Sequence, residues 1–236
     1  MNEFRSLADL LDLQALDSAI DRLLEERSGL PELERFKAAH EEAAAIGADL
    51  ARLEGELTTT RRALDKAEGE LEILEQKATV TEQRLYAGGM NARETEHMQA
   101  DVAMLKHQVG DQEEAVLVLI DQRESLDEQV SGRSSDHEQA LAAKGELEAA
   151  IKEAWSRIDA EIARKEARKS DLVPSIDDDL VALYEKSREA HAGVGVGALE
   201  NETCGACHVG LSPREVAVLK REEFPRCVHC NRLLVI

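Results

Sequence analysis

Apolar residues recur along most of the chain at the spacing of one face of a helix. Between residues 36 and 85, one series repeats every seven residues and a second lies between its members. Two interleaved series of this kind are typical of a left-handed coiled-coil seam. The first runs Phe36, Ala43, Leu50, Leu57, Leu64, Leu71, Ala78 and Leu85, and the second Ala39, Ile46, Leu53, Thr60, Ala67, Leu74 and Thr81.

The same spacing predicts helices on both sides of this stretch. Residues 2–27 form one stripe, which stops before Ser28-Gly29-Leu30-Pro31, and a longer stripe runs from Met98 to Ile162 with an expected kink at 131–135. A turn at 86–91 contains two glycines, after which Asn91 and Glu94 supply a capping box. Two halves of similar length predict an antiparallel hairpin, because folding back buries both stripes. Pairing between chains stays open, since heptads also pair intermolecularly.

Three domains are expected. A helical coiled-coil hairpin spans 1–191, with its turn at 86–91 and a short helix at 175–191 that begins after Pro174 and is capped by Ser175 and Asp178. A Gly/Val linker spans 192–198. Its glycines do not indicate a phosphate-binding loop, because no strand precedes them and no helix follows directly. The remaining residues, 199–236, form a cysteine-containing module.

Composition supports a mainly α fold. Only 3 % of the chain is aromatic while 33 % is charged, which argues against one large globular core. The net charge of −20 excludes a surface that follows a nucleic acid backbone throughout. The chain has neither 18 consecutive apolar residues nor a signal peptide at its start, so we expect a cytoplasmic protein without membrane contact.

The cysteines carry the clearest chemistry. Two CxxC pairs, Cys204/Cys207 and Cys227/Cys230, are separated by 19 residues, the spacing of a four-cysteine zinc ribbon. We expect one structural Zn²⁺, because four thiolates leave no open coordination position. A haem attachment signal at Cys204–His208 would leave the second pair unexplained, and a thioredoxin-like pair would need a βαβ context. The neighbouring histidines, His208 and His229, are expected at the surface.

The rest of the module is small and uncharged overall. Ser212-Pro213-Arg214-Glu215 predicts a capped helix that runs to about Lys220, and Arg232–Ile236 predicts a terminal strand. A module of 38 residues needs metal for much of its folding energy, so we expect chelation to unfold it and to spare the helices. Its five basic residues match five acidic ones, so the −20 belongs to the helical part.

Catalytic patterns are missing. His40-Glu41 and His137-Glu138 begin like HExxH, but Ala44 and Leu141 stand where the second histidine is required. The sequence has neither a nucleophile elbow nor a phosphate loop. We therefore expect that the protein is not an enzyme.

Two segments are similar to a known family. The turn Arg84-Leu85-Tyr86-Ala87-Gly88, with the following Arg93–Gln99, and the end Cys227-Val228-His229-Cys230-Asn231-Arg232-Leu233-Leu234 resemble the bacterial C4-type zinc-ribbon coiled-coil hairpin proteins. Ala87, Val228 and Asn231 replace the family's usual Ser, Pro and Gly, and Asn tolerates a left-handed backbone. The resemblance implies a chaperone-like or adaptor protein, of the kind tied to flagellar or type III export, with protein and RNA partners.

We therefore expect a non-enzymatic adaptor that mediates macromolecular interactions. Its expected contact sites are the turn and the ribbon, with the residues Tyr86, Met90, Arg214, Lys220, Arg221, Arg226 and His229. Tyr86 alternatively caps the end of the coiled-coil seam. The alternative function is a zinc-ribbon regulator that binds RNA or DNA through the ribbon.

Overall fold

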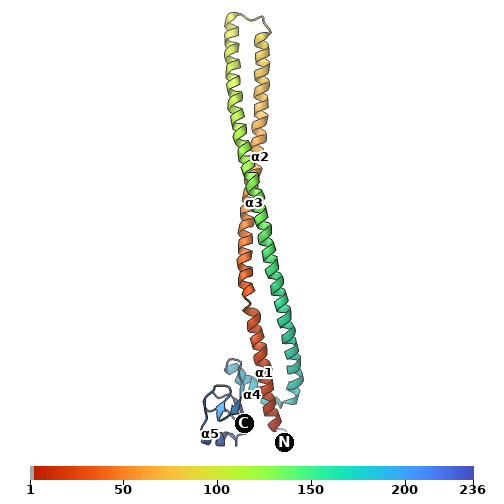
Figure 1. The fold of residues 1–236 in the computed structure, drawn as a ribbon, viewed down its shortest axis with the longest axis vertical. Coiled ribbons are helices and arrows are strands. Elements are labelled where there is room, and N and C mark those ends of the chain that lie inside the picture. The colour runs from red at the N-terminus through yellow and green to blue at the C-terminus, as the bar shows by residue number, and fades with distance from the viewer. Residues whose placement is uncertain (1–2) are drawn as a thin grey trace. The chain divides into compact units, whose positions relative to one another are not determined.

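The computed structural model describes residues 3–236 and is mainly helical (Figure 1). Its contacts divide the chain into two compact units. We call Arg35–Glu146 the hairpin unit, and we call the residues up to Glu34 together with Leu147–Ile236 the ribbon unit.

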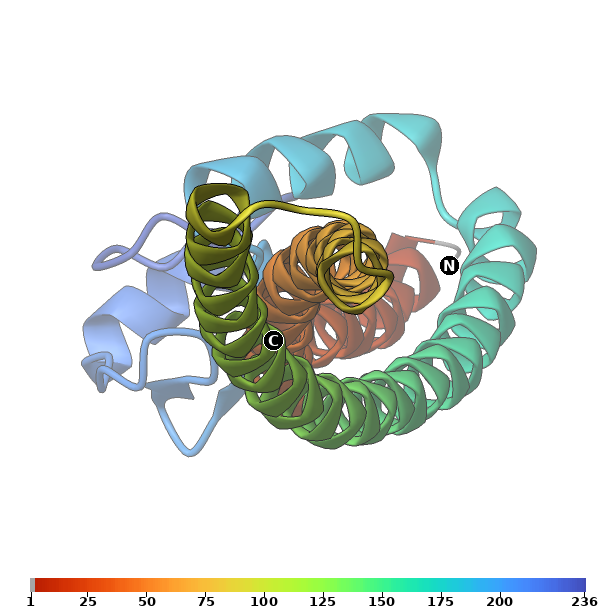
Figure 2. The same cartoon turned by 90° about the horizontal axis from the view of Figure 1, so that it is seen from above.

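The hairpin unit consists of most of α2 (Pro31–Tyr86) and the part of α3 (Ala92–Leu172) up to Glu146, which run antiparallel and wind about each other (Figures 1 and 2). The turn between them requires glycine, because Gly88 and Gly89 have φ of +80° and +92°. Asn91 Oδ1 accepts from the Glu94 N–H, and Glu94 Oε2 accepts from the Asn91 N–H, both at 3.0 Å. The predicted capping box and helical hairpin are thus confirmed.

The buried residues of α2 all belong to the two predicted seven-residue series: Ala43, Leu53, Leu57, Leu64, Ala67 and Ala78. The helix does not break at the kink expected at 131–135, since α3 continues through these residues. Arg133 of this segment pairs with Asp49 of α2 at 3.1 Å. Contact with the opposite arm therefore outweighs the weak helix propensity of the Ser and Gly residues.

Polar contacts between the arms fix their register. Gln112 donates to the Ala67 carbonyl at 3.0 Å. The ion pairs Arg61–Asp127 (2.6 Å) and Lys106–Glu82 (2.7 Å) also cross between the arms. A similar leucine seam would survive a shift by seven residues, but these contacts would be lost. They fix the register of the two arms, whereas pairing between chains stays open.

The ribbon unit combines α1 (Glu3–Ser28) and the end of α3 with a 3₁₀ turn, η1 (Val173–Ser175), and α4 (Asp178–Ala190). A three-stranded sheet follows, with the order β2-β1-β3. Its strands are β1 (Val196–Glu200), β2 (Thr203–Cys204) and β3 (Leu233–Val235), and α5 (Pro213–Leu219) lies between β2 and β3 in the chain. β1 is antiparallel to β2 and parallel to β3.

The segment expected to be a linker, 192–198, is instead closely packed and contains the start of β1. A Cβ added at Gly195 would lie 2.8 Å from the Tyr184 carbonyl oxygen, and one added at Gly197 would lie 2.7 Å from the Ala206 nitrogen. These glycines therefore allow close packing rather than flexibility. The helix after Pro174 is capped by Asp177, which accepts from the Asp179 N–H, and not by Ser175.

The sheet buries a different set of residues on each face. Val196 and Leu233 face a core built from α1, η1 and α4, whose buried members are Leu10, Leu13, Ile176, Leu180 and Tyr184. Leu199 and Leu234 face a second core that contains Cys204, Leu211, Leu219 and Cys227. The cysteine module is thus not a body separate from the helices, contrary to the boundary expected at residue 199, because its strands complete the core of α1 and α4.

No helix within residues 3–236 combines the length and the apolar character needed to cross a membrane.

The seam can be tested by a matched pair of substitutions in α2. Leu64 is 4 % exposed, whereas Ile73 is 52 % exposed on the same helix. Leu64→Ala is expected to lower the free energy of unfolding by about 2–4 kcal/mol, since it leaves a cavity between the arms. Ile73→Ala is expected to change it by less than about 0.5 kcal/mol. Denaturant unfolding followed by circular dichroism at 222 nm measures both, and equal losses would contradict the seam described above.

Candidate metal centre

Four cysteine thiols meet between two turns of the ribbon unit. The Sγ atoms of Cys204, Cys207, Cys227 and Cys230 all lie within 4.8 Å of one another. The Cys204–Cys230 and Cys207–Cys227 distances are 4.0 and 3.8 Å. A tetrahedron of sulfurs around Zn²⁺ has edges of about 3.8 Å, since each Zn–S bond is near 2.3 Å. The thiols therefore fit a single tetrahedral ion.

The two turns that carry the thiols have the same backbone hydrogen bonds. In the first, the Cys204 N–H donates to the Val209 carbonyl (3.0 Å) and the His208 N–H donates to the Cys204 carbonyl (2.8 Å). In the second, the Cys227 N–H donates to the Arg232 carbonyl (2.9 Å) and the Asn231 N–H donates to the Cys227 carbonyl (2.8 Å). The ribbon thus repeats one turn twice, and each copy presents two thiols to the other.

Each turn needs a left-handed residue four positions after its first cysteine. Asn231 has φ of +61°, as expected for the residue that replaces glycine, and His208 has φ of +60° at the equivalent position. The left-handed conformation of His208 could not be read from its residue type alone, because most histidines have negative φ even though histidine is enriched among left-handed residues. Alignment of the two CxxC pairs is the signal that would have found it.

Burial and hydrogen bonding shift the pKa values of the thiols in opposite directions. Burial raises the pKa of the Cys204 thiol to about 12, while N–H groups of Cys207 and Ala206 act in the opposite direction. Burial likewise raises the pKa of Cys227, against the N–H groups of Cys230 and His229. Burial also acts upward on Cys230, but hydrogen bonds that include the Arg232 backbone lower its pKa below the usual value. These N–H groups stabilise thiolates, the form that binds metal.

α5 closes one side of the cluster. Its predicted capping box is present, since Ser212 Oγ accepts from the Glu215 N–H and Glu215 Oε2 accepts from the Ser212 N–H at 2.7 Å. Leu219 at its end is buried against Cys204 and Cys227. The cap sets where α5 begins, and the helix then places Leu219 over the thiols.

The histidines and basic residues of the ribbon lie outside the cluster. Within the described chain, no histidine joins the four thiols, and both His208 and His229 are exposed as expected. Arg226 donates to the Asn231 carbonyl at 3.2 Å, so its guanidinium supports the second turn. Arg214, Lys220 and Arg221 are exposed.

The predicted contact residues of the turn belong to the hairpin unit. Tyr86 is 78 % exposed, which does not fit a residue that covers the end of the seam. Met90 is half-buried, although a contact residue of the turn is expected to be exposed.

Sequence reasoning missed two polar residues that are buried in α1. Gln14 and Asp17 are 7 % and 3 % exposed. In an amphipathic helix, polar residues are expected on the solvent-exposed face, and this expectation applies to Gln14 although it lies next to the apolar Leu13. Apart from Ser18, which accepts from Gln14, their hydrogen-bond partners lie more than 150 residues away in the chain, so local periodicity carries no signal for this burial.

Comparison with known proteins gives a family and several relatives. The model of the CT398-like coiled coil hairpin domain matches residues 13–192. The uncharacterized protein Rv2229c of Mycobacterium tuberculosis is 24 % identical over 229 residues, which cover 96 % of this chain and 93 % of that protein. The four cysteines lie outside the residues that the family model matches.

Solved structures resemble the chain over nearly its whole length. A protein from Mycobacterium smegmatis superposes with a TM-score of 0.83 at 25 % identity, covering 98 % of this chain and 97 % of that one. CT398 from Chlamydia trachomatis superposes with a TM-score of 0.73 at 17 % identity, covering 98 % of both chains. At that identity the second likeness supports the fold alone.

The left-handed position in the second turn can be tested at Asn231, whose side chain is exposed. Asn231→Gly is expected to keep or improve the stability of the ribbon, because glycine adopts this backbone freely. Asn231→Val is expected to cost about 1–2 kcal/mol, since a branched side chain clashes in the left-handed region. Amide hydrogen exchange of peptides from residues 225–236 measures the difference, and indistinguishable exchange in the two variants would refute the assigned backbone.

Proposed function

The chain belongs to the family of the CT398-like coiled coil hairpin domain, and we propose that it is a zinc-stabilised, non-enzymatic adaptor. In this proposal the hairpin and the ribbon present separate surfaces to macromolecular partners. The observation that supports it is that four thiols converge in a small module with short strands, which follows a long helical hairpin in the chain.

Zinc is the metal that this donor set fits best. Four sulfur ligands at tetrahedral spacing favour Zn²⁺ over the oxygen-preferring Mg²⁺ and Ca²⁺. All four positions around the ion are occupied by protein, so the metal joins the two turns and has no position left for a substrate. The bound ion supplies the crosslink, while the backbone N–H groups hold the thiolates.

The metal assignment predicts a simple stoichiometry. Protein purified without chelators is expected to contain one zinc per chain by elemental mass spectrometry. Cys227→Ser is expected to lose most of it, since three thiolates leave the site incomplete. His229→Ala, in the same turn, serves as the control and is expected to keep one equivalent. Full zinc occupancy in Cys227→Ser, or none in the wild type, would count against the assignment.

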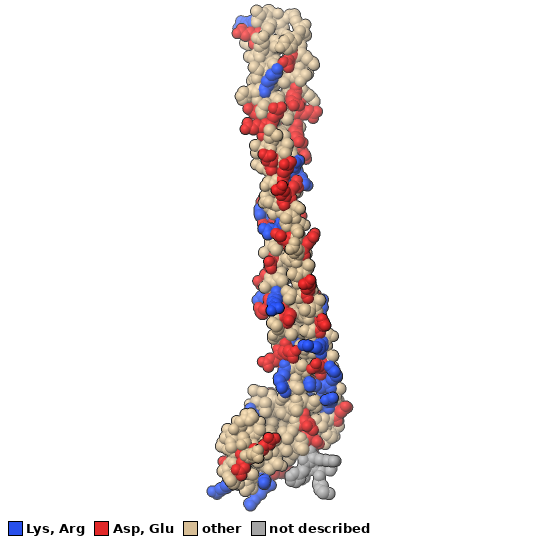
Figure 3. Space-filling view, in the orientation of Figure 1, with Lys and Arg blue, Asp and Glu red and all other residues tan. Residues whose placement is uncertain are grey.

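The turn of the hairpin supports an adaptor role. Acidic side chains are distributed along the visible face of the arms, whereas the turn carries few charges (Figure 3). Tyr86 protrudes beside a shallow groove between the arms, whose apolar lining comes from Leu85, Val102 and Ala103. Lys106 and Glu82 also line this groove, and they form an ion pair in which Nζ and Oε1 are 2.7 Å apart. A protruding aromatic ring beside an apolar groove suits a protein partner, because such residues dominate protein interfaces.

The ribbon is the second surface of the proposal, and it also carries the alternative of RNA binding. Arg214, Lys220 and Arg221 are exposed there, while Arg226 and Arg232 donate to backbone carbonyls. Three exposed basic side chains, in a segment whose net charge is zero and within an acidic protein, give a weak phosphate-binding surface. We therefore propose a protein as the first partner.

Crosslinked co-purification from the native cell tests the role of the turn. The double variant Tyr86→Ala, Met90→Ala is expected to lose a specific set of crosslinked proteins, because it removes the apolar side chains of the turn. Leu117→Ala is the matched control, since Leu117 is 61 % exposed on the arm of α3. An unchanged protein set would remove the turn from the proposal. RNA that crosslinks to the wild type and is lost in Arg214→Ala, Arg221→Ala protein would favour the alternative.

A further inference from the structure

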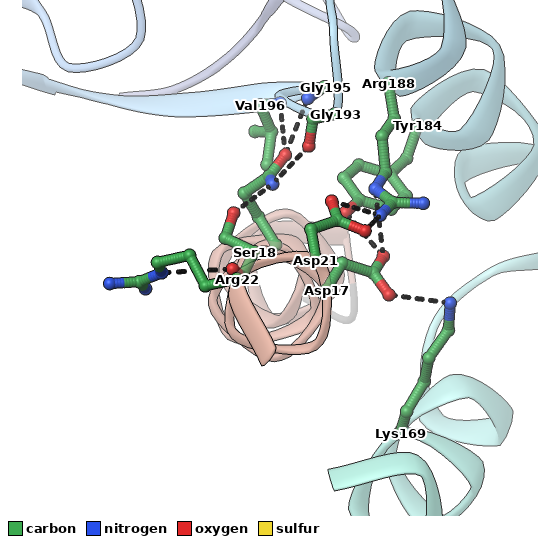
Figure 4. Close-up of polar contacts among 11 residues, drawn as sticks. Asp17, Ser18, Asp21, Arg22, Lys169, Tyr184, Arg188, Gly193, Gly195 and Val196 are labelled. Atoms are coloured by element: carbon green, nitrogen blue, oxygen red, sulfur yellow. Dashed lines mark hydrogen bonds and ion pairs between the residues drawn. The ribbon is translucent and has the colours of Figure 1, made fainter. Parts of the chain in front are cut away.

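Three polar residues on one face of α1 contact α4, the end of α3 and the segment before β1. Gln14, Asp17 and Asp21 are three and four positions apart, so they share one face of the helix. Figure 4 shows Asp17 and Asp21 directed toward α4 and Lys169, while Arg22 points away from them. We call Gln14, Asp17 and Asp21 the α1 clasp.

Gln14 holds the segment that leads into β1. Its side-chain oxygen accepts from the N–H groups of Gly195 (2.6 Å) and Val196 (3.4 Å), and its side-chain nitrogen donates to the Gly193 carbonyl (2.8 Å). A single side chain thus satisfies three backbone groups at a buried site. Loss of these bonds would leave buried polar groups unpaired, which is costly.

Asp17 and Asp21 hold α4 and the end of α3. The Asp17 carboxylate accepts from the Tyr184 hydroxyl (2.7 Å) and from Lys169 Nζ (2.8 Å). Arg188 of α4 donates to Asp21 at 2.6 Å. Burial and the Asp17 carboxylate raise the pKa of Tyr184 far above its usual value, so its hydroxyl remains a neutral donor. The buried carboxylate needs these partners, because an unpaired charge is strongly destabilising.

The clasp is connected to the thiols through the sheet. Gly195, which Gln14 holds by its N–H, accepts from the Leu233 N–H of β3 at 3.1 Å. On β1, the Ala198 carbonyl accepts from the Gly205 N–H, between the first two cysteines, at 2.8 Å. The second cysteine pair ends three residues before Leu233. Each turn that carries thiols is thus bound directly to a strand that α1 also contacts.

We propose that metal occupancy of the four cysteines controls the docking of α1 onto the sheet. In this proposal the α1 clasp supplies the polar contacts of α1 that respond to the metal. This inference rests on the metal binding proposed above. Without the ion, the two turns lose their crosslink, and β1 and β3 lose the support of one face. The Gln14 bonds and the contacts of Leu10 and Leu13 then weaken, because they need both strands in place.

Amide hydrogen exchange of the full chain, with zinc bound and after its removal, measures this coupling. Peptides that cover residues 10–21 are expected to exchange roughly ten-fold faster or more after metal removal, so α1 is not spared as the sequence alone predicts. Peptides within residues 50–78 of the hairpin unit are expected to be unchanged and serve as the internal control.

The coupling must also operate in the reverse direction, because linkage between two sites is reciprocal. Gln14→Ala is expected to weaken zinc affinity by roughly five-fold or more in a chelator competition, although Gln14 does not touch the thiols. Tyr184→Phe removes one hydroxyl with little change in packing and is expected to shift the affinity in the same direction. Arg22→Ala is the matched control, since among the described residues Arg22 donates only to the Ser18 carbonyl of its own helix.

The outcomes separate this inference from the proposed function. If the wild-type protein binds no zinc, the proposed metal site fails. If it binds one equivalent, but residues 10–21 exchange equally with and without it, the metal assignment stands and the coupling to α1 is overturned. An unchanged affinity in both Gln14→Ala and Tyr184→Phe would overturn the coupling as well.

Discussion

The small sheet of the ribbon unit must bury both of its faces, and the rest of that unit depends on this constraint. Successive residues of a strand point to opposite faces, so Leu233 enters the core of α1 and α4 while Leu234 enters the core of the thiols. Neither core is large. The sheet therefore joins a helical core, stabilised by apolar burial and the α1 clasp, to a second core in which cysteines occupy the place of large apolar side chains.

The hairpin unit follows a different principle. Its seam of Leu53, Leu57 and Leu64 supplies burial along the arms, while contacts such as Gln112 to the Ala67 carbonyl select a single register. The stability of this unit comes from burial along its arms. The exposed Tyr86 of the turn adds little to that burial, so it is available to bind a partner. In the ribbon, by contrast, β1 and β3 are packed on both faces, so the exposed surface lies mainly on α5 and the two turns.

The sequence predicts features whose cause is local and fails where the cause is distant. The hairpin follows from the repeat around Leu57 and Leu64, and the cysteine cluster follows from two short CxxC pairs, since both are patterns of near neighbours. β1 looked like a linker, because Val196 becomes a strand residue only through pairing with Leu233 and packing on Tyr184. Gln14 and Asp17 looked like surface residues for the same reason. Their burial is decided by α4 and the segment before β1, which lie far along the chain.

A zinc ion held by four thiolates, as proposed above, would keep the sheet in place although the core around it is small. X-ray absorption at the zinc edge, measured on the purified full chain, tests it most directly. Four sulfur ligands at about 2.3 Å are expected, with no nitrogen or oxygen ligand. Zinc bound through nitrogen or oxygen, or a chain that contains no zinc when purified without chelators, would contradict it.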